Sequence, residues 1–120
     1  DTGKTINQHG AEGQVEGGVV MGLGFALSEE FRIKEGIIIS DTLGKLGLRK
    51  IGQTPEIEAI LVEDPHLEGP YGAKGMGELP LSPIAPAVVH AIYKAIGVWI
   101  TDLPATSEKI LKGVTKLVKN

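Results

Sequence analysis

Apolar residues recur at four-residue steps over the first patterned segment, which runs from about Glu12 to Arg32. The repeat consists of Val15, Val19, Leu23, Leu27 and Phe31. Such spacing places side chains on one face of a helix, so we predict a helix here, preceded by a polar loop over residues 1–10. The helix has to be held by tertiary packing, because each glycine inside it costs about 1 kcal/mol relative to alanine. These glycines are Gly17, Gly18, Gly22 and Gly24.

The glycines of this segment form pairs four residues apart. Gly18 and Gly22 share one helix face, and Gly13 and Gly17 share another. Because glycine has no Cβ, a neighbouring backbone or a ligand can come close to such a face. The pattern leaves both interpretations open: close packing within the protein, or contact with a ligand.

The middle of the chain predicts two strands joined by a long connection. The β-branched run at residues 37–39 favours a strand. Residues 40–54 contain three glycines and read as a connection. Residues 56–63 begin by alternating polar and apolar side chains, which is typical of a strand.

The last third predicts two helices. Ser82 and Pro83 are suited to the N-cap and the first helical position, and Gly97 to the C-cap. The predicted buried stripe of this helix is Ile84, Val88, Ala91, Ile92 and Ala95. A last strand over residues 98–101 then precedes an amphipathic helix capped by Thr106.

These elements predict an α/β (α+β) fold in one segment, residues 1–120. It has a short mixed sheet, a glycine-rich first helix and two C-terminal helices. The length suffices for one domain.

Composition excludes several classes of function. The net charge of −3 argues against nucleic-acid binding. The absence of cysteine excludes a thiolate nucleophile and iron–sulfur ligation by this chain, and the three histidines are too scattered to predict a metal site. The longest uncharged apolar run, residues 17–27, is shorter than the roughly 20 residues that span a bilayer.

Two segments carry candidate chemistry. In the loop over residues 69–80, glycines let the main chain approach a ligand, and Glu78 offers a carboxylate that can act as a general base. Lys74 can hydrogen-bond the backbone or an anion. In residues 13–18, the amide of Gln14 at a glycine-lined helix start can donate and accept hydrogen bonds, which suits the edge of a heteroaromatic ring or a pterin. Taken singly, each segment is also compatible with a surface loop or a packed helix.

Taken together, the motifs resemble one family in order and spacing. The motifs are D-T-G-K-T-I-N, G-Q-V-E-G-G-V-V-M-G-L-G, P-E-I-E-A-I-L-V-E, G-P-Y-G-A-K-G-M-G-E-L-P and L-P-A-T-S-E-K-I-L. Over nearly the whole chain they are similar to the C-terminal part of the large subunit of the molybdenum hydroxylases, the xanthine dehydrogenase and aldehyde oxidase family. The resemblance therefore implies that the chain is part of a larger molybdenum-cofactor-binding domain.

The resemblance implies a set of site residues. Glu78 matches the active-site base of the family. Gly13 and Gln14 match the helix start that contacts molybdopterin, and Lys74, Gly75, Met76 and Gly77 match the loop beside that cofactor. No residue of this chain is expected to ligate the metal.

The resemblance also implies partners and a reaction. The expected partners are the rest of the molybdopterin subunit and the domains or subunits that carry the iron–sulfur clusters and FAD. The expected location is the cytoplasm. The expected reaction is hydroxylation of a small molecule, an aldehyde or N-heterocycle. Leu79-Pro80 stands where purine-oxidising relatives commonly have two prolines. This difference weakly disfavours a purine as the expected substrate.

Three functional hypotheses remain open from the sequence. The first is a catalytic segment that is inactive when isolated, either a fragment or a naturally split subunit. The second is a non-catalytic remnant or assembly module that keeps the fold. The third is a small nucleotide-binding domain built on Gly3-Lys4-Thr5 or on the glycine-rich loop. The tripeptide lacks the preceding glycine-rich turn that a phosphate-binding loop needs.

Overall fold

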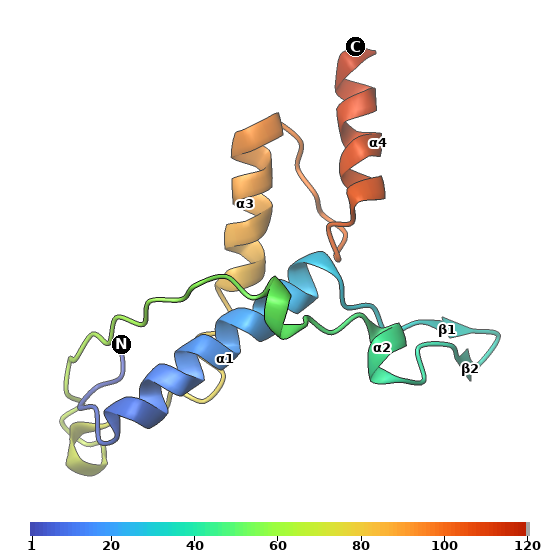
Figure 1. The fold of residues 1–120 in the computed structure, drawn as a ribbon. Helices are drawn as coiled ribbons and strands as arrows, with labels where there is room; N and C mark the ends of the chain where they lie inside the picture. Colours follow the sequence, from blue (N-terminus) through green and yellow to red (C-terminus); the bar gives the residue numbers. More distant parts are fainter. Residues whose placement is uncertain (120) are drawn as a thin grey trace.

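The computed structural model describes residues 1–119, which form helices joined by long extended segments and one small sheet (Figure 1). Along the chain the elements are α1 (Gln8–Leu27), β1 (Ile33–Lys34), β2 (Ile37–Ile38), α2 (Leu43–Leu46), the 3-10 turns η1 (Ile51–Gln53) and η2 (Pro70–Gly72), α3 (Ile84–Ile96) and α4 (Ser107–Val118). The predicted combination of helices with a small sheet is confirmed. The predicted mixed sheet is wrong, because the sheet found in residues 1–119 has two antiparallel strands.

Helix α1 begins four residues earlier than the apolar repeat predicts. Asn7 precedes it in an extended conformation, and its side-chain oxygen accepts a hydrogen bond from the N–H of Gly10 at 2.9 Å. Asparagine is a favoured N-cap residue because it satisfies a backbone donor that the helix leaves free. Residues 8–10 therefore belong to the helix and not to the predicted polar loop. Gln14 consequently lies in the second turn of α1, which corrects its predicted place at the helix start.

The predicted strand at residues 37–39 is confirmed as β2, which pairs with β1 through Ile33 opposite Ile38. The turn between them has φ angles of 51° at Glu35 and 79° at Gly36. Positive φ at both central residues matches the twist of a tight hairpin.

Two other segments that the sequence predicts as strands do not form part of a sheet within residues 1–119. Residues 56–63 and 98–101 run extended, but neither segment pairs with a strand within residues 1–119. A strand-like sequence needs a neighbouring backbone before a ladder can form.

Helix α3 starts one residue after the predicted proline. Pro83 occupies the cap position, no side chain caps the helix, and Ser82 lies in the preceding turn. The predicted C-cap is confirmed, because Gly97 has a φ of 69° and donates its N–H to the carbonyl of Tyr93 at 2.7 Å. The predicted cap of α4 is also confirmed, since Thr106 accepts from the N–H of Lys109 at 3.3 Å.

Glycines allow α1 to lie against the turn that leads into α3. A Cβ on Gly18 would lie 2.8 Å from Cβ of Pro80, and one on Gly22 would overlap the side chain of Ile84. Close packing within the protein is therefore what this glycine pair provides. On the other face, a Cβ on Gly13 or Gly17 would meet no atom within 4 Å.

A second apolar cluster joins α3 to α4. Val98, Ile100 and Ala105 are buried in the linker between these helices, and residues of both helices pack on them. The N–H of Ala105 donates to the carbonyl of Ala26 at 2.6 Å, which ties this linker to the end of α1. The predicted stripe on α3 is only partly right, because Ala91 and Ala95 are exposed.

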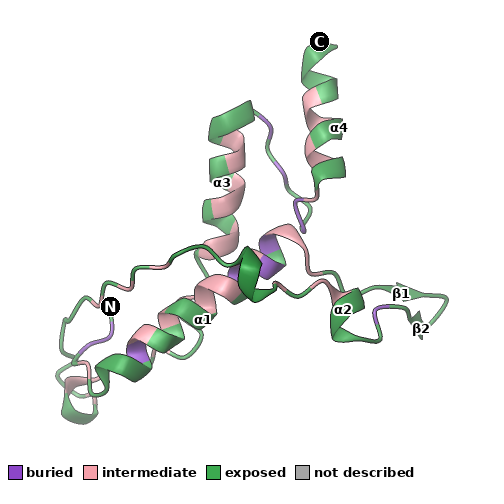
Figure 2. Cartoon of the chain, viewed as in Figure 1, coloured by how far each residue is buried: buried purple, intermediate pink, exposed green. Residues whose placement is uncertain are grey.

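Few residues are buried, and most are half-buried or exposed (Figure 2). The accessible surface is 8707 Å², against about 6,200 Å² for a compact protein of this mass. The radius of gyration is 18.0 Å, against about 14 Å for 120 compact residues. No helix within residues 1–119 is long and apolar enough to cross a membrane.

The glycine contact predicts opposite effects of two matched substitutions in α1. Gly22→Ala should lower the free energy of unfolding by about 1–3 kcal/mol, because the new methyl group overlaps Ile84. Gly17→Ala has open space and should raise it by up to about 1 kcal/mol through helix propensity. Urea denaturation followed by circular dichroism measures both values. Equal stability of the two variants would contradict the packing described.

Candidate functional site

The glycine-rich loop is held by the first residues of the chain. Gly3 and Ala73 form an antiparallel bridge, the N–H of Lys4 donates to the carbonyl of Gly72 at 2.7 Å, and the N–H of Lys74 donates to the carbonyl of Thr2 at 3.0 Å. Gly72 has a φ of 82°, a conformation that favours glycine. Two segments about 70 residues apart in the sequence therefore form one unit.

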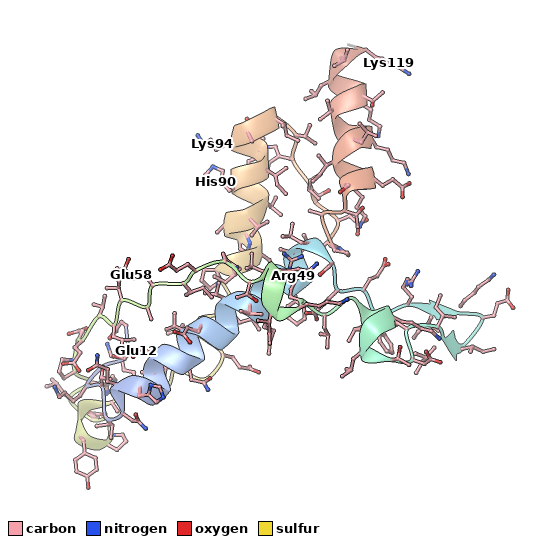
Figure 3. The ribbon with its side chains drawn as sticks, in the orientation of Figure 1. Glu12, Arg49, Glu58, His90, Lys94 and Lys119 are labelled. Atoms are coloured by element: carbon pink, nitrogen blue, oxygen red, sulfur yellow. The ribbon has the colours of Figure 1, made fainter. Side chains whose placement is uncertain are left out.

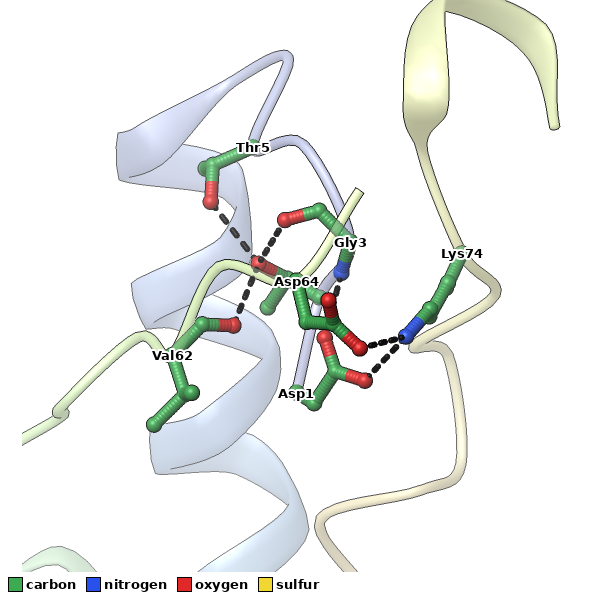
Figure 4. Close-up of polar contacts among 7 residues, drawn as sticks. Asp1, Gly3, Thr5, Val62, Asp64 and Lys74 are labelled. Atoms are coloured by element: carbon green, nitrogen blue, oxygen red, sulfur yellow. Dashed lines mark hydrogen bonds and ion pairs between the residues drawn. The ribbon is translucent and has the colours of Figure 1, made fainter. Parts of the chain in front are cut away.

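The extended segment that ends at Asp64 joins the same unit (Figure 4). The N–H of Thr2 donates to the carbonyl of Val62 at 2.9 Å. The Lys74 ammonium contacts the carboxylate of Asp1 and that of Asp64, the latter at 3.2 Å. Lys74 thus links the glycine-rich loop to both other segments through its side chain.

Glu63 adds a further link from this segment. Its carboxylate accepts from the N–H of Thr5 at 2.8 Å and from the ammonium of Lys4 at 3.0 Å. These two donors, the Thr5 N–H foremost, lower the pKa of Glu63 below its ordinary value. Because Lys4 is paired here and α1 begins only at Gln8, the tripeptide Gly3-Lys4-Thr5 does not have the geometry of a phosphate-binding loop.

A pocket of about 240 Å³ opens where this unit meets the first turns of α1. It brings together three residues that the sequence predicts for cofactor binding, Gln14, Lys74 and Met76. The remaining lining residues are Thr2, Lys4, Thr5, Ile6, Asn7, Gly10, Ala11 and Ala73. Sequence reasoning did not assign the N-terminal residues to the site, although Asn7 could have been recognised as a helix N-cap.

A larger, mainly apolar pocket of about 620 Å³ lies next to the first and shares Met76 and Thr2 with it. Its walls come from α1, from residues 60–62 and from the turn before α3. Leu79 and Pro80, which directly follow Glu78, line it. Met76 therefore lies between the two pockets and lines both of them.

Glu78 lies in the turn that leads to α3, where its carbonyl accepts from the N–H of Leu81 at 3.1 Å. Its side chain is exposed and lines neither pocket, and its carboxylate has no hydrogen bond or ion pair within residues 1–119. The structure thus presents the predicted base on an open surface between two pocket-lining residues, Met76 and Leu79.

The predicted glycines fall into two groups. Around Gly75 and Gly77 an added Cβ would meet no atom within 4 Å, so the main chain of the loop is accessible. Gly13 lines a different pocket, of about 780 Å³, on another side of α1. The structure therefore does not bring Gly13 together with Gln14 in one pocket.

The residues around the 240 Å³ pocket fit a polar heterocyclic cofactor such as a pterin. The side-chain amide of Gln14 is exposed and makes no hydrogen bond within residues 1–119, so its donor and acceptor are both available. Thr2 and Thr5 also line the pocket, and their hydroxyl groups lie 2.8 Å apart, within hydrogen-bond distance of each other. Within the described residues, no cluster of three His, Cys, Asp or Glu side chains is arranged to hold a metal ion.

Known proteins resemble this chain in sequence. Residues 1–55 match the family described as the molybdopterin cofactor-binding domain. The aldehyde oxidoreductase of Megalodesulfovibrio gigas is 42% identical over 95% of this chain and 12% of its own length. The molybdenum-binding subunit of the xanthine dehydrogenase of Escherichia coli O157:H7 is 38% identical over 92% of this chain and 15% of its own length.

Solved structures share the fold as well. The aldehyde oxidoreductase from Desulfovibrio gigas is 41% identical, covers 96% of this chain and 12% of its own, and has a TM-score of 0.87. The Cu,Mo-CO dehydrogenase, at 28% identity, covers 98% of this chain and 15% of its own with a TM-score of 0.86. The fold and the sequence thus match a segment of the molybdenum-binding subunits and chains of these relatives. The chain belongs to the molybdenum hydroxylase family and corresponds to a segment of its large subunit, spanning about an eighth to a seventh of the length of these relatives.

The contacts of Glu63 predict a pH dependence in the N-terminal unit. A carboxyl group with a lowered pKa stabilises the folded state above its ordinary value of 4.5, and this contribution is lost as pH falls through the lowered value. The NMR shift of the Thr5 amide should therefore titrate with a midpoint below 4.5. Glu63→Gln should abolish this titration. A midpoint at or above 4.5 would contradict the hydrogen bonds described.

Proposed function

We propose that this chain forms part of the molybdopterin site of an oxidoreductase that hydroxylates an aldehyde or an N-heterocycle. The observation that carries the proposal is the meeting of Gln14, Lys74 and Met76 at one pocket, from segments about 60 residues apart in the sequence. The family match covers residues 1–55, and the pocket residues Ala73, Lys74 and Met76 lie outside that match.

Gln14 is the residue best suited to hold the pterin edge. Its amide makes no hydrogen bond within residues 1–119, and an amide can donate and accept in the same plane. The accessible main chain at Gly75 and Gly77, with Met76 between them, lets the loop approach the same group. Gly13 would act through the close approach it allows on the neighbouring face of α1.

Lys74 lines this pocket, but its ammonium already pairs with Asp1 and Asp64. We assign it the task of placing the loop against the N-terminal segment. Lys74 then contributes to cofactor binding only by fixing the positions of Gly75 and Met76. This is a positioning role and not a catalytic one.

Glu78 is the proposed general base. The bound cofactor supplies the redox centre of the reaction, and Glu78 supplies a carboxylate that accepts a proton there. Its carboxylate is exposed and makes no hydrogen bond or ion pair within residues 1–119 that would compete for that proton. The short turn from Glu78 to Leu81 fixes the backbone beneath it, and α1 fixes that turn through Gly18.

The rest of the enzyme follows from the family. We propose that the remainder of the molybdopterin-binding subunit closes the site, that iron–sulfur clusters and FAD reside on partner domains or subunits, and that the isolated chain does not turn over substrate. Residues 1–120 then form one portion of a molybdopterin-binding domain. The cytoplasmic location predicted from the sequence stays a prediction.

Replacing the proposed base should strongly lower the turnover rate and leave the cofactor content unchanged. Glu78→Gln in the assembled enzyme should lower kcat by about 100-fold to 10,000-fold, the range that a general base contributes. Molybdenum and pterin contents should be unchanged. Steady-state kinetics and metal analysis on the same preparation measure both quantities.

Glu68→Gln is the matched control for this substitution. Glu68 is an exposed carboxylate at the start of the same loop region and should leave kcat unchanged. If Glu78→Gln also turned over at the original rate, the chain would instead be a non-catalytic remnant or assembly module that retains the fold.

Replacing the proposed pterin contact should weaken cofactor retention. Gln14→Leu removes the amide and should raise the dissociation constant of the pterin by about tenfold, the upper effect of one hydrogen bond. His9→Leu changes an exposed polar residue of the same helix outside the pocket and should retain the cofactor. Cofactor content after dialysis, read by fluorescence of the oxidised pterin, separates the variants. Equal retention would exclude Gln14 from the site.

A further inference from the structure

Residues 56–62 have the form of a β-strand without a partner. The segment runs alongside α1 (Figure 1), and its side chains alternate in burial. Ile57, Ala59 and Leu61 are half-buried and line pockets that residues of α1 also line. Glu58 lies on the other side of the segment, away from α1 (Figure 3). The chain therefore places a strand over a helix, as in a layered α/β domain.

The backbone of this segment is almost entirely unpaired. The carbonyl of Val62 accepts from Thr2, and no other backbone hydrogen bond within residues 1–119 involves residues 56–62. In an extended strand, the N–H and C=O of one residue point to the same edge and those of the next residue point to the opposite edge. The edge defined by residues 57, 59 and 61 is therefore fully open, whereas Thr2 covers the end of the other edge.

The side chains on this segment indicate that it is not a solvated loop. Ile60 is 77% exposed and Val62 is 58% exposed, although both are β-branched. A strand of this kind with free backbone groups is a template for another strand. The accessible surface exceeds that of a compact protein by roughly 2,500 Å², which is enough to accommodate a large interface.

We infer that residues 56–62 pair, through the edge of Ile57, Ala59 and Leu61, with a β-strand from the rest of the molybdopterin-binding subunit. The matched segment makes up 12% to 16% of its curated relatives, so most of such a subunit lies outside it and can supply the strand. The solved relative with 41% identity has nearly the same backbone over 96% of this chain, inside a much longer chain.

Charge argues against self-pairing of this segment. Glu56 and Glu58 are exposed and form no ion pair within residues 1–119. Antiparallel pairing with a second copy in the register that sets Glu58 opposite its own copy would place two carboxylates side by side, and like charges directly opposite one another destabilise a ladder. The strand that fits here has apolar side chains toward α1 and Lys or Arg facing Glu58.

Hydrogen–deuterium exchange in the assembled subunit tests the pairing directly. The amides of Ile57, Ala59 and Leu61 should exchange about 100-fold more slowly than that of Leu67, which is fully exposed in a neighbouring turn. Equal rates would overturn the inference. Slow exchange that is lost on dilution to single subunits would mean pairing with a second copy, and would overturn it as well.

A pair of proline variants provides the second test. Ala59→Pro removes one donor from the open edge and should lower the yield of assembled subunit by about tenfold. Leu67→Pro is the control, because Leu67 follows His66 in a turn closed by Gly69 N–H and His66 O at 3.1 Å, a position that accepts proline. Equal yields would contradict the pairing.

The inference rests on membership of the family and not on Glu78. Glu78→Gln should assemble normally whatever its turnover, whereas Ala59→Pro should fail in assembly. Failure of the strand pairing and failure of the proposed catalytic role are therefore distinguishable.

Discussion

Helix α1 lies so close to the start of α3 and to the turn before it that two positions on α1 have no room for a Cβ atom. At Gly18 the neighbour is Pro80, and at Gly22 it is Ile84. Glu78 belongs to the same turn, two residues before Pro80. Because Gln14 lies one helical turn before Gly18, this contact sets the relation between the proposed pterin-binding amide and the proposed base. A side chain at either glycine would move the two apart.

The N-terminal residues provide the second constraint on the site. They bond to the glycine-rich loop through Gly72 and Lys74 and to the extended segment through Val62 and Glu63. Three stretches far apart in the sequence are thereby held at one end of α1. Backbone hydrogen bonds supply the geometry, and ion pairs of Lys4 and Lys74 complete it. The pocket that contains Gln14 is lined by the N-terminal residues, the glycine-rich loop and α1.

The proposed site is one side of a larger one. Glu78 and the main chain at Gly75 and Gly77 face open space, and residues 56–62 carry unpaired backbone groups. These open features accompany an accessible surface of 8707 Å², against about 6,200 Å² for a compact protein of this mass. In the relatives, the same fold is a small part of a long chain. The open surfaces are where we expect that remaining structure to pack.

The sequence by itself determined the features that depend on local geometry. Gly97 ends α3 and Thr106 begins α4 because capping needs only nearby backbone groups. The order of the glycine and glutamate motifs along the chain is sufficient to indicate the family. The apolar repeat missed the start of α1, since the Asn7 cap precedes it. Only the tertiary structure decided which glycine pair packs internally, that the Lys74 ammonium is held by Asp1 and Asp64, and that residues 56–62 find no strand partner within residues 1–119. Each of these depends on groups far apart in the chain, whose distance no local pattern encodes.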